Sequence, residues 1–139
     1  MEKSLKIGDS ASLTRSFTDA DVRLYADLSG DHNPVHLDEA FAAGTQFKQR
    51  IVHGMLVGSL FTALLGEQLP GRGSIYMTQN LNFKAPVFLN TPVTAKVEIT
   101  GFHPKKPIVM FACTVVDAEG KTLVQGDSVM YVPWLKMES

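Results

Sequence analysis

Three polar side chains with acid, base and hydrogen-bonding chemistry lie within six residues of one another. Asp31, Asn33 and His36 occur in the segment Leu28-Ser-Gly-Asp-His-Asn-Pro-Val-His-Leu-Asp38, between two helix-like stretches. A loop at this place can turn a carboxylate, a carboxamide and an imidazole toward one point. A positioned carboxylate and imidazole are the common groups for proton transfer to and from a reacting substrate. The segment therefore predicts acid–base catalysis.

A second short segment, Ile51-Val-His-Gly-Met55, opens an apolar helix-like stretch. The first backbone N–H groups of a helix have no partner inside the helix and can stabilise negative charge that develops on an oxygen. Gly54 is the candidate donor, although a glycine here could equally serve close helix packing. Together the two segments predict catalysis at a carbonyl group.

Each polar candidate also has an ordinary structural interpretation. Asp31 follows a glycine, where aspartate commonly forms a turn or caps a helix. His36 could be a hydrogen-bonded histidine of the core. We assign structural roles to His32 and to Asp38, which stands where a helix N-cap is needed. The occurrence of Asp31, Asn33 and His36 together favours catalysis over these separate roles.

The composition limits the classes of function. With 139 residues, 45% of them hydrophobic, the chain fits one globular domain over residues 1–139. A net charge of -1 gives no electrostatic reason to expect nucleic acid or an anionic membrane as partner. The apolar run Met55–Leu65 is too short to span a bilayer, and the first residues lack a signal or transit pattern. The lone Cys113 predicts a reducing compartment: the cytoplasm, or the mitochondrial matrix of a eukaryote after processing.

The hydrophobic period changes along the chain from that of helices to that of strands. Capping residues and apolar spacing predict a strand near residues 11–17, a helix from Thr18 to Gly30, and a short turn from Asp38 that Gly44 ends. An apolar core helix follows, over about residues 53–67. Period-two alternation then predicts strands over 75–84, 93–100, 108–116 and 122–132, with a hairpin turn at 117–120. The prediction is an α+β fold with about five antiparallel strands around one buried helix.

The sequence resembles the MaoC-like hydratases of the hot-dog fold, in particular the (R)-specific enoyl-CoA hydratases and the mitochondrial hydroxyacyl-thioester dehydratases. The resemblance covers nearly the whole chain, from about residue 17 to residue 132. It is carried by Tyr25-Ala-Asp-Leu-Ser-Gly-Asp-His-Asn-Pro-Val-His-Leu-Asp38, Ile51-Val-His-Gly-Met55, Leu64-Leu-Gly-Glu-Gln-Leu-Pro-Gly71 and Asn82-Phe-Lys-Ala-Pro-Val87. It implies a single hot-dog domain, in which the sheet wraps around the central helix.

The resemblance also implies an activity and its residues. A protein of this family would hydrate trans-2-enoyl-CoA to (R)-3-hydroxyacyl-CoA, or dehydrate the product, without a cofactor. Asp31 and His36 would be catalytic, Asn33 would help to hold the reacting water, and the N–H of Gly54 would point at the thioester oxygen. Hot-dog relatives pair two protomers into one continuous sheet, so we expect a homodimer.

Substrate-binding residues are expected on the same basis. By resemblance, Thr62 lies near the catalytic histidine, and Leu65 and Met130 are candidates for the acyl pocket, although each could equally be a plain core residue. Phosphates of CoA need positive charge. The basic residues expected near the emerging thioester tail are Lys84, Lys105, Lys106, Arg72 and Arg50, unless they only solubilise the surface.

Other functions remain open or are disfavoured. A non-catalytic acyl-thioester-binding domain would keep the pocket without needing Asp31, Asn33 and His36 together, and a dehydratase acting on acyl-carrier-protein thioesters would use the same residues. A thioesterase is disfavoured because residues 55–66 contain no acidic side chain. We expect no metal, because Pro34 prevents His32 and His36 from sharing a helical face and no Cys pair or His-Glu-x-x-His pattern is present.

Overall fold

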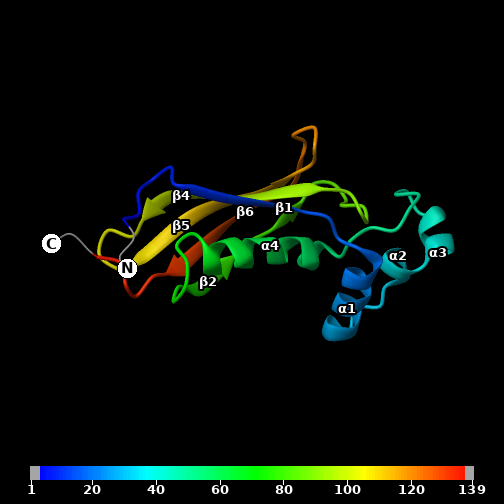
Figure 1. Cartoon of the computed structure of the whole chain (residues 1–139), viewed down its shortest axis with the longest axis horizontal. Coiled ribbons are helices and arrows are strands. Elements are labelled where there is room, and N and C mark those ends of the chain that lie inside the picture. Colours follow the sequence, from blue (N-terminus) through cyan, green and yellow to red (C-terminus); the bar gives the residue numbers. More distant parts are fainter. Residues whose placement is uncertain (1–3, 137–139) are drawn as a thin grey trace.

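An antiparallel sheet lies along one long helix, with three short helices beyond one end of that helix (Figure 1). The computed structural model describes residues 4–136. Within this range the elements are β1 (Ser10–Arg15), α1 (Asp19–Ser29), α2 (Pro34–Leu37), α3 (Glu39–Ala43), α4 (Gly54–Glu67), β2 (Ile75–Gln79), β3 (Asn82–Phe83), β4 (Val93–Phe102), β5 (Ile108–Val116) and β6 (Thr122–Tyr131).

The strands follow the order β1-β4-β5-β6-β2, and β3 pairs with β6 next to β2. Alternate residues of β4 and β5 are buried, as the period of two requires when one face of a sheet covers a core. The long strands β4, β5 and β6 form the centre of the sheet. The predicted α+β fold is confirmed, and β5 is the central strand that its apolar sequence indicated.

The helix α4 supplies the other half of the core. Its buried side chains are Val57, Leu60, Phe61, Leu64 and Leu65. Burying a side chain of this kind stabilises the fold by roughly 1.5–3 kcal/mol. The sequence predicted a helix buried nearly all round, but Met55, Thr62 and Ala63 are exposed. One sheet face covers only one side of α4 in the protomer, so the opposite side stays open.

Local capping explains the helices before α4. Thr18 and Asp21 form the predicted capping box of α1, and Gly30 ends that helix in the left-handed conformation, with φ of 84°. Asp38 caps α3 as predicted, since its Oδ1 accepts a hydrogen bond from the N–H of Phe41 at 3.1 Å. The one-turn helix α2 was not predicted. Pro34 occupies its first turn, where the missing N–H costs nothing, and Asn33 is the N-cap.

The single strand predicted over residues 75–84 is interrupted. β2 and β3 both pair with β6, so the sheet has six strands instead of about five. Between them the backbone of Asn80 approaches Gly126 so closely that a Cβ at Gly126 would overlap the Asn80 carbonyl. Asn80 also bonds Asp127, through the Asn80 N–H to the Asp127 carbonyl at 2.9 Å. The break therefore depends on a partner far away in the sequence.

The edge strand β2 is exposed over most of its length. Ile75, Tyr76 and Met77 are exposed, and among residues 4–136 β2 pairs only with β6. In the part of the chain that the structure describes, no helix has the length and apolar character to cross a membrane.

Candidate active site

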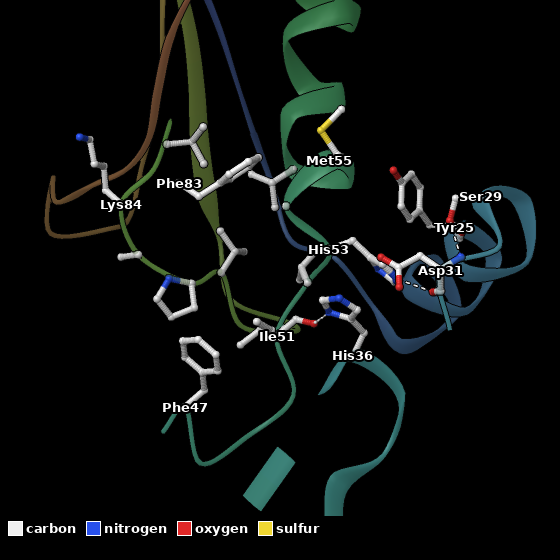
Figure 2. Close-up of a pocket in the computed structure, with 17 residues that line it drawn as sticks. Tyr25, Ser29, Asp31, His36, Phe47, Ile51, His53, Met55, Phe83 and Lys84 are labelled. Atoms are coloured by element: carbon white, nitrogen blue, oxygen red, sulfur yellow. Dashed lines mark hydrogen bonds between the residues drawn. The ribbon is translucent and has the colours of Figure 1, made fainter. Parts of the chain in front are cut away.

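A cavity of about 490 Å³ opens where the N-terminal end of α4 meets the segment that carries Asp31 and His36. It has a polar and an apolar side (Figure 2). The polar side consists of Tyr25, Ser29, Asp31, His36 and His53. The apolar side includes Phe47, Ile51, Val57, Phe83, Pro86, Val87 and Val124. A cavity of this size with few convergent polar groups is typical of a site for a small, partly apolar molecule.

His36 is held as a neutral base. Its Nδ1 lies 2.8 Å from the carbonyl oxygen of Ile51 (Figure 2). A carbonyl only accepts hydrogen bonds, so Nδ1 carries the proton and Nε2 keeps a free lone pair. The side chain is 8% exposed. Burial lowers the pKa of His36, which outweighs the opposing effect of the bond to Ile51. The ring is therefore neutral near pH 7 and able to take up a proton.

Asp31 lies in the loop between α1 and α2, with its carboxylate at the cavity wall. Its own N–H donates to Ser29 Oγ at 3.1 Å, and its Oδ1 accepts from the N–H of Asn33 at 3.1 Å. Its backbone carbonyl accepts from Nε2 of His53 at 3.0 Å. The residue that forms the turn is thus also the one that lines the cavity, because the bonds that shape the loop also aim the carboxylate.

Asn33 is placed differently from the other two residues of the motif. Its Oδ1 accepts a hydrogen bond from the N–H of Val35 at 3.3 Å, as the N-cap of α2. The side chain is not part of the cavity wall. The structure gives Asn33 a role in shaping the turn that presents His36, and its expected contact with water stays a prediction.

Gly54 begins α4 and lines the cavity. The carbonyl of His53 accepts from the N–H groups of Leu56 and Val57, whereas the N–H groups of Gly54 and Met55, at the start of the helix, have no intrahelical acceptor. A Cβ on Gly54 would lie 2.8 Å from Cε1 of Phe83. The ring of Phe83 packs where a side chain would stand, which supports close packing as one reason for this glycine, and donation to an oxyanion stays a prediction.

A buried arginine supports the backbone of His36. Arg50 is 7% exposed, and its Nε donates to the carbonyl of His36 at 2.7 Å. Its guanidinium also bonds Asp19 at 2.7 Å and lies 3.6 Å from Glu39. Hydrogen bonds from Arg50 and then Arg23 hold the pKa of Asp19 below its ordinary value. Arg50 was expected among the basic residues near the emerging thioester tail, but it is buried and its charge is paired with carboxylates.

The expected substrate-binding residues divide into two groups. Lys84 lines the cavity, and its backbone N–H is fixed to the carbonyl of Leu123 at 2.8 Å. Leu65 and Met130 are buried in the core, and Thr62 is exposed on α4. None of these three lines the cavity in the protomer.

The other predicted basic residues lie away from the cavity. Lys105 and Lys106 are in the turn between β4 and β5, whereas Val124 of the cavity wall pairs with Val115 near the turn between β5 and β6. In an antiparallel sheet these two turns lie at opposite ends (Figure 1). Arg72 is exposed and paired with Glu67 at 2.9 Å.

Sequence reasoning did not identify the position of His53 in this site. The motif marked it only as the start of a helix, but its ring stacks on that of His36 with centroids 3.9 Å apart and planes inclined by 26°. One nitrogen of each histidine and one carboxylate oxygen of Asp31 lie within 4.8 Å of one another. The cluster does not fit a metal. The ring planes of His36 and His53 are so nearly parallel that lone pairs in those planes would meet much farther away than the ~2.0–2.1 Å length of a Zn–N bond. The two rings therefore cannot direct their lone pairs at one ion.

Comparison with known proteins agrees with this geometry. Residues 4–120 match the family model of the MaoC like domain. The chain belongs to the MaoC-like family. Over 131 residues this MaoC-like protein is 49% identical to the (R)-specific enoyl-CoA hydratase of Aeromonas caviae, an alignment that covers 94% of this chain and 98% of the relative. It is 45% identical to the (R)-specific enoyl-CoA hydratase of Rhodospirillum rubrum, with 94% and 90% covered.

A solved structure extends the likeness from sequence to fold. The (R)-hydratase from A. caviae involved in PHA biosynthesis superimposes on the MaoC-like protein with a TM-score of 0.92 and 48% identity, covering 95% of this chain and 100% of that one. The resemblance that the two motifs indicated is confirmed, and so is the hot-dog fold that it implied.

Proposed function

We propose that this MaoC-like protein hydrates trans-2-enoyl-CoA to (R)-3-hydroxyacyl-CoA and catalyses the reverse dehydration. One observation carries the proposal: a neutral His36 with a free Nε2 and the carboxylate of Asp31 meet in a cavity at the N-terminal end of α4. The identity to named hydratases over nearly the full length supports the same reaction.

The chemistry needs one base, one acid and one oxyanion donor. Nε2 of His36 takes a proton from water as the water oxygen forms a bond to C3 of the enoyl thioester. Asp31 is the partner of His36 in delivering that proton to C2, so both groups end the cycle in the protonation states in which they began it. The product gains one H and one OH, so atoms balance without a cofactor. The division of roles between the two side chains is our hypothesis.

Gly54 supplies the third function. Negative charge builds on the thioester oxygen as water adds to C3, and the free N–H groups at the start of α4 are the donors at hand. Losing one such donor typically costs ~10²–10³ in rate. The apolar side of the cavity, from Phe47 to Val124, suits the acyl chain next to the thioester.

Lys84 is the basic side chain best placed for the carrier. It is exposed and lines the cavity, whereas Lys105 and Lys106 lie at the other end of the sheet. A lysine there can meet a phosphate of CoA or an acidic surface of an acyl carrier protein through charge alone. Both carriers therefore fit the site, and parallel assays with the two thioesters distinguish them.

The protein acts as a homodimer in our proposal. Ile75 and Met77 are exposed apolar side chains of β2, at an edge of the sheet where the described part of the chain adds no further strand. Phe83, nearby in sequence, is 53% exposed. Exposed edge strands are natural sites for pairing with a second chain. Light scattering should give twice the mass of the protomer, and an active monomer would contradict the proposal.

The core and the single cysteine bear on domain organisation and on location in the cell. One connected core joins residues from Phe17 to Val132, which supports a single domain over the whole chain. Cys113 is fully buried, with Sγ 3.5 Å from Ser128 Oγ. A reduced, buried thiol fits the cytoplasm, or the mitochondrial matrix if the source is eukaryotic, and this location stays a prediction.

Crotonyl-CoA is the substrate that tests the activity. Purified protein should cause loss of the enoyl-thioester absorbance, and the 3-hydroxy product should have the R configuration. Longer enoyl chains should be tried in the same assay. Tight binding of enoyl thioesters without any turnover would favour the non-catalytic binding domain, and release of free CoA would favour a thioesterase.

A further inference from the structure

We infer that His53 is a positioning residue for this reaction: from the polar side of the cavity wall it fixes Asp31 and His36 relative to one another. The inference rests on the proposed function and adds to it a residue that touches both catalytic candidates. His53 is joined to Asp31 by a hydrogen bond and to His36 by ring stacking. It also precedes Gly54 in the chain and stands at the N-cap position of α4, where its side chain makes no capping bond.

The surroundings of His53 fix the ring closely. Its side chain is 2% exposed. The ring of His36 stacks on it at 3.9 Å, and the ring of Tyr25 lies 4.8 Å away with planes inclined by 60°. Asp31, His36 and Tyr25 are thus the titratable groups against it. A ring enclosed in this way cannot turn without moving the residues that we assign to catalysis.

Two side-chain hydrogen bonds cross between the same two segments in opposite directions, beside the backbone bond from the N–H of Ile51 to the carbonyl of Val35 at 3.3 Å. His36, in the segment of residues 31–36, donates through Nδ1 to the carbonyl of Ile51 at 2.8 Å. His53, in the segment of residues 51–53, donates through Nε2 to the carbonyl of Asp31 at 3.0 Å. We call this pair of bonds and the stacked rings the histidine clasp. It joins two segments that no strand pairing connects.

The clasp requires opposite tautomers in its two rings. Since each carbonyl can only accept, His36 carries its proton on Nδ1 and His53 carries its proton on Nε2. The two histidines thus have different tasks: Nε2 of His36 is free to take up a proton, whereas Nε2 of His53 is engaged by the carbonyl of Asp31.

The Nδ1 atom of His53 argues that a histidine is not at this position to stabilise the fold. Nδ1 is buried and has no hydrogen-bond partner among residues 4–136. An unpaired buried acceptor destabilises a fold, and a phenylalanine would fill the same space without one. What histidine adds over phenylalanine is the Nε2–H bond to Asp31. That bond acts on the loop that aims the catalytic carboxylate.

Two substitutions separate the bond from the ring. His53→Phe keeps an aromatic ring against His36 and removes the donor, whereas His53→Gln keeps a donor at a similar reach and removes the ring. We expect His53→Phe to lower kcat by about 10–100-fold with KM changed by less than about 3-fold, because a displacement of about 1 Å of catalytic groups can cost ~10² in rate. Its melting temperature should be unchanged or higher. His53→Gln should recover part of the lost kcat.

The activities of the two variants can contradict the inference in two ways. Wild-type kcat in His53→Phe, or a kcat of His53→Gln no higher than that of His53→Phe, would overturn the inference. Because either variant could fold poorly, the tautomers of the wild-type protein give a second measurement. Long-range ¹H–¹⁵N NMR correlations should show His36 protonated at Nδ1 and His53 at Nε2 near pH 7. The opposite tautomer in either ring would also overturn it.

Failure of the inference and failure of the proposed function look different. If wild-type protein hydrates no enoyl thioester, the proposed function is lost and the positioning role is lost with it. If wild-type protein is active but the tautomers are reversed or His53→Phe retains full kcat, only the role of His53 is overturned.

Discussion

The core between the sheet and α4 differs from the segment of residues 29–53 in what holds it in place. Phe61, Leu64 and Leu65 of α4 are fully buried among the apolar residues of the sheet. Asp31 and His36 are held mainly by directional bonds to His53, Ile51 and Arg50. A buried apolar side chain contributes roughly 1.5–3 kcal/mol and a hydrogen bond a net ~0.5–1.5 kcal/mol.

Because the two regions are held in different ways, we expect mutations in them to have different effects. Apolar contacts are numerous and non-directional, so losing one weakens the fold but leaves the cavity in place. The polar bonds are few, and each fixes the direction of a group that we propose to be catalytic. We therefore expect stability and activity to separate when the two regions are mutated in turn.

The largest effect on activity is expected in the segment of residues 29–53. Asp31→Ala should lower kcat by about 10²–10⁴-fold, the usual contribution of a group that transfers a proton. The carboxylate is exposed and forms no ion pair among residues 4–136, so the melting temperature should change little. Initial rates with crotonyl-CoA and a thermal melt test both statements. An equal loss of rate and of folded protein would show that Asp31 is structural.

A substitution in the apolar core should lower stability and leave activity largely unchanged. Phe61→Ala removes a side chain that is 0% exposed and should destabilise the protein by about 3–5 kcal/mol. Denaturant unfolding gives this value, and a kcat within about 3-fold of wild type is expected for the fraction that remains folded. A variant that is stable but inactive would contradict the separation of the two regions.

Arg50 tests the boundary between the regions, because it is buried and also bonds the backbone of His36. Arg50→Met leaves the His36 carbonyl without that partner and should cost about 1–3 kcal/mol in stability, with a smaller loss of kcat. Arg23→Met is the matched control, since Arg23 bonds the same Asp19 from an exposed position and should cost about 0–1 kcal/mol. Equal effects of the two substitutions would show that burial of Arg50 is unimportant.

Lys84→Ala should have the smallest effect and should act on binding alone. Loss of one exposed positive charge should raise KM for a CoA substrate a few-fold at low salt, with kcat unchanged, because a phosphate contact is the same in the ground and transition states. The effect should shrink at high salt. Lys105→Ala, at the other end of the sheet, should leave KM unchanged. A larger effect from Lys105 than from Lys84 would reverse our placement of the carrier.

The two regions also differ in how well the sequence predicts them. The period of two over Val93–Phe102 reports a local property, which is burial of one sheet face, and β4 was predicted for that reason. The break between β2 and β3 was not predicted, because it depends on contact between Asn80 and Gly126. The one-turn helix α2 was also missed, since a proline after a capping asparagine fits a bend as well as a helix start.

In the candidate site, too, the sequence predicts local features better than contacts between distant residues. The closeness of Asp31 and His36 could be predicted because both lie in one short motif with a recognisable family pattern. The roles of His53 and Arg50 could not, since their partners Asp31 and Asp19 lie 22 and 31 residues away. Only the folded chain brings these groups together, and neither residue type indicates such a bond from its place in the sequence.

A double-mutant cycle on Asp31 and His36 tests the central claim most directly. If both side chains serve one water in one step, Asp31→Ala and His36→Ala should each lower kcat/KM for crotonyl-CoA strongly, and the double variant should be little worse than either single one. Circular dichroism would establish that all three variants are folded. Two small losses that simply multiply in the double variant would contradict a shared site.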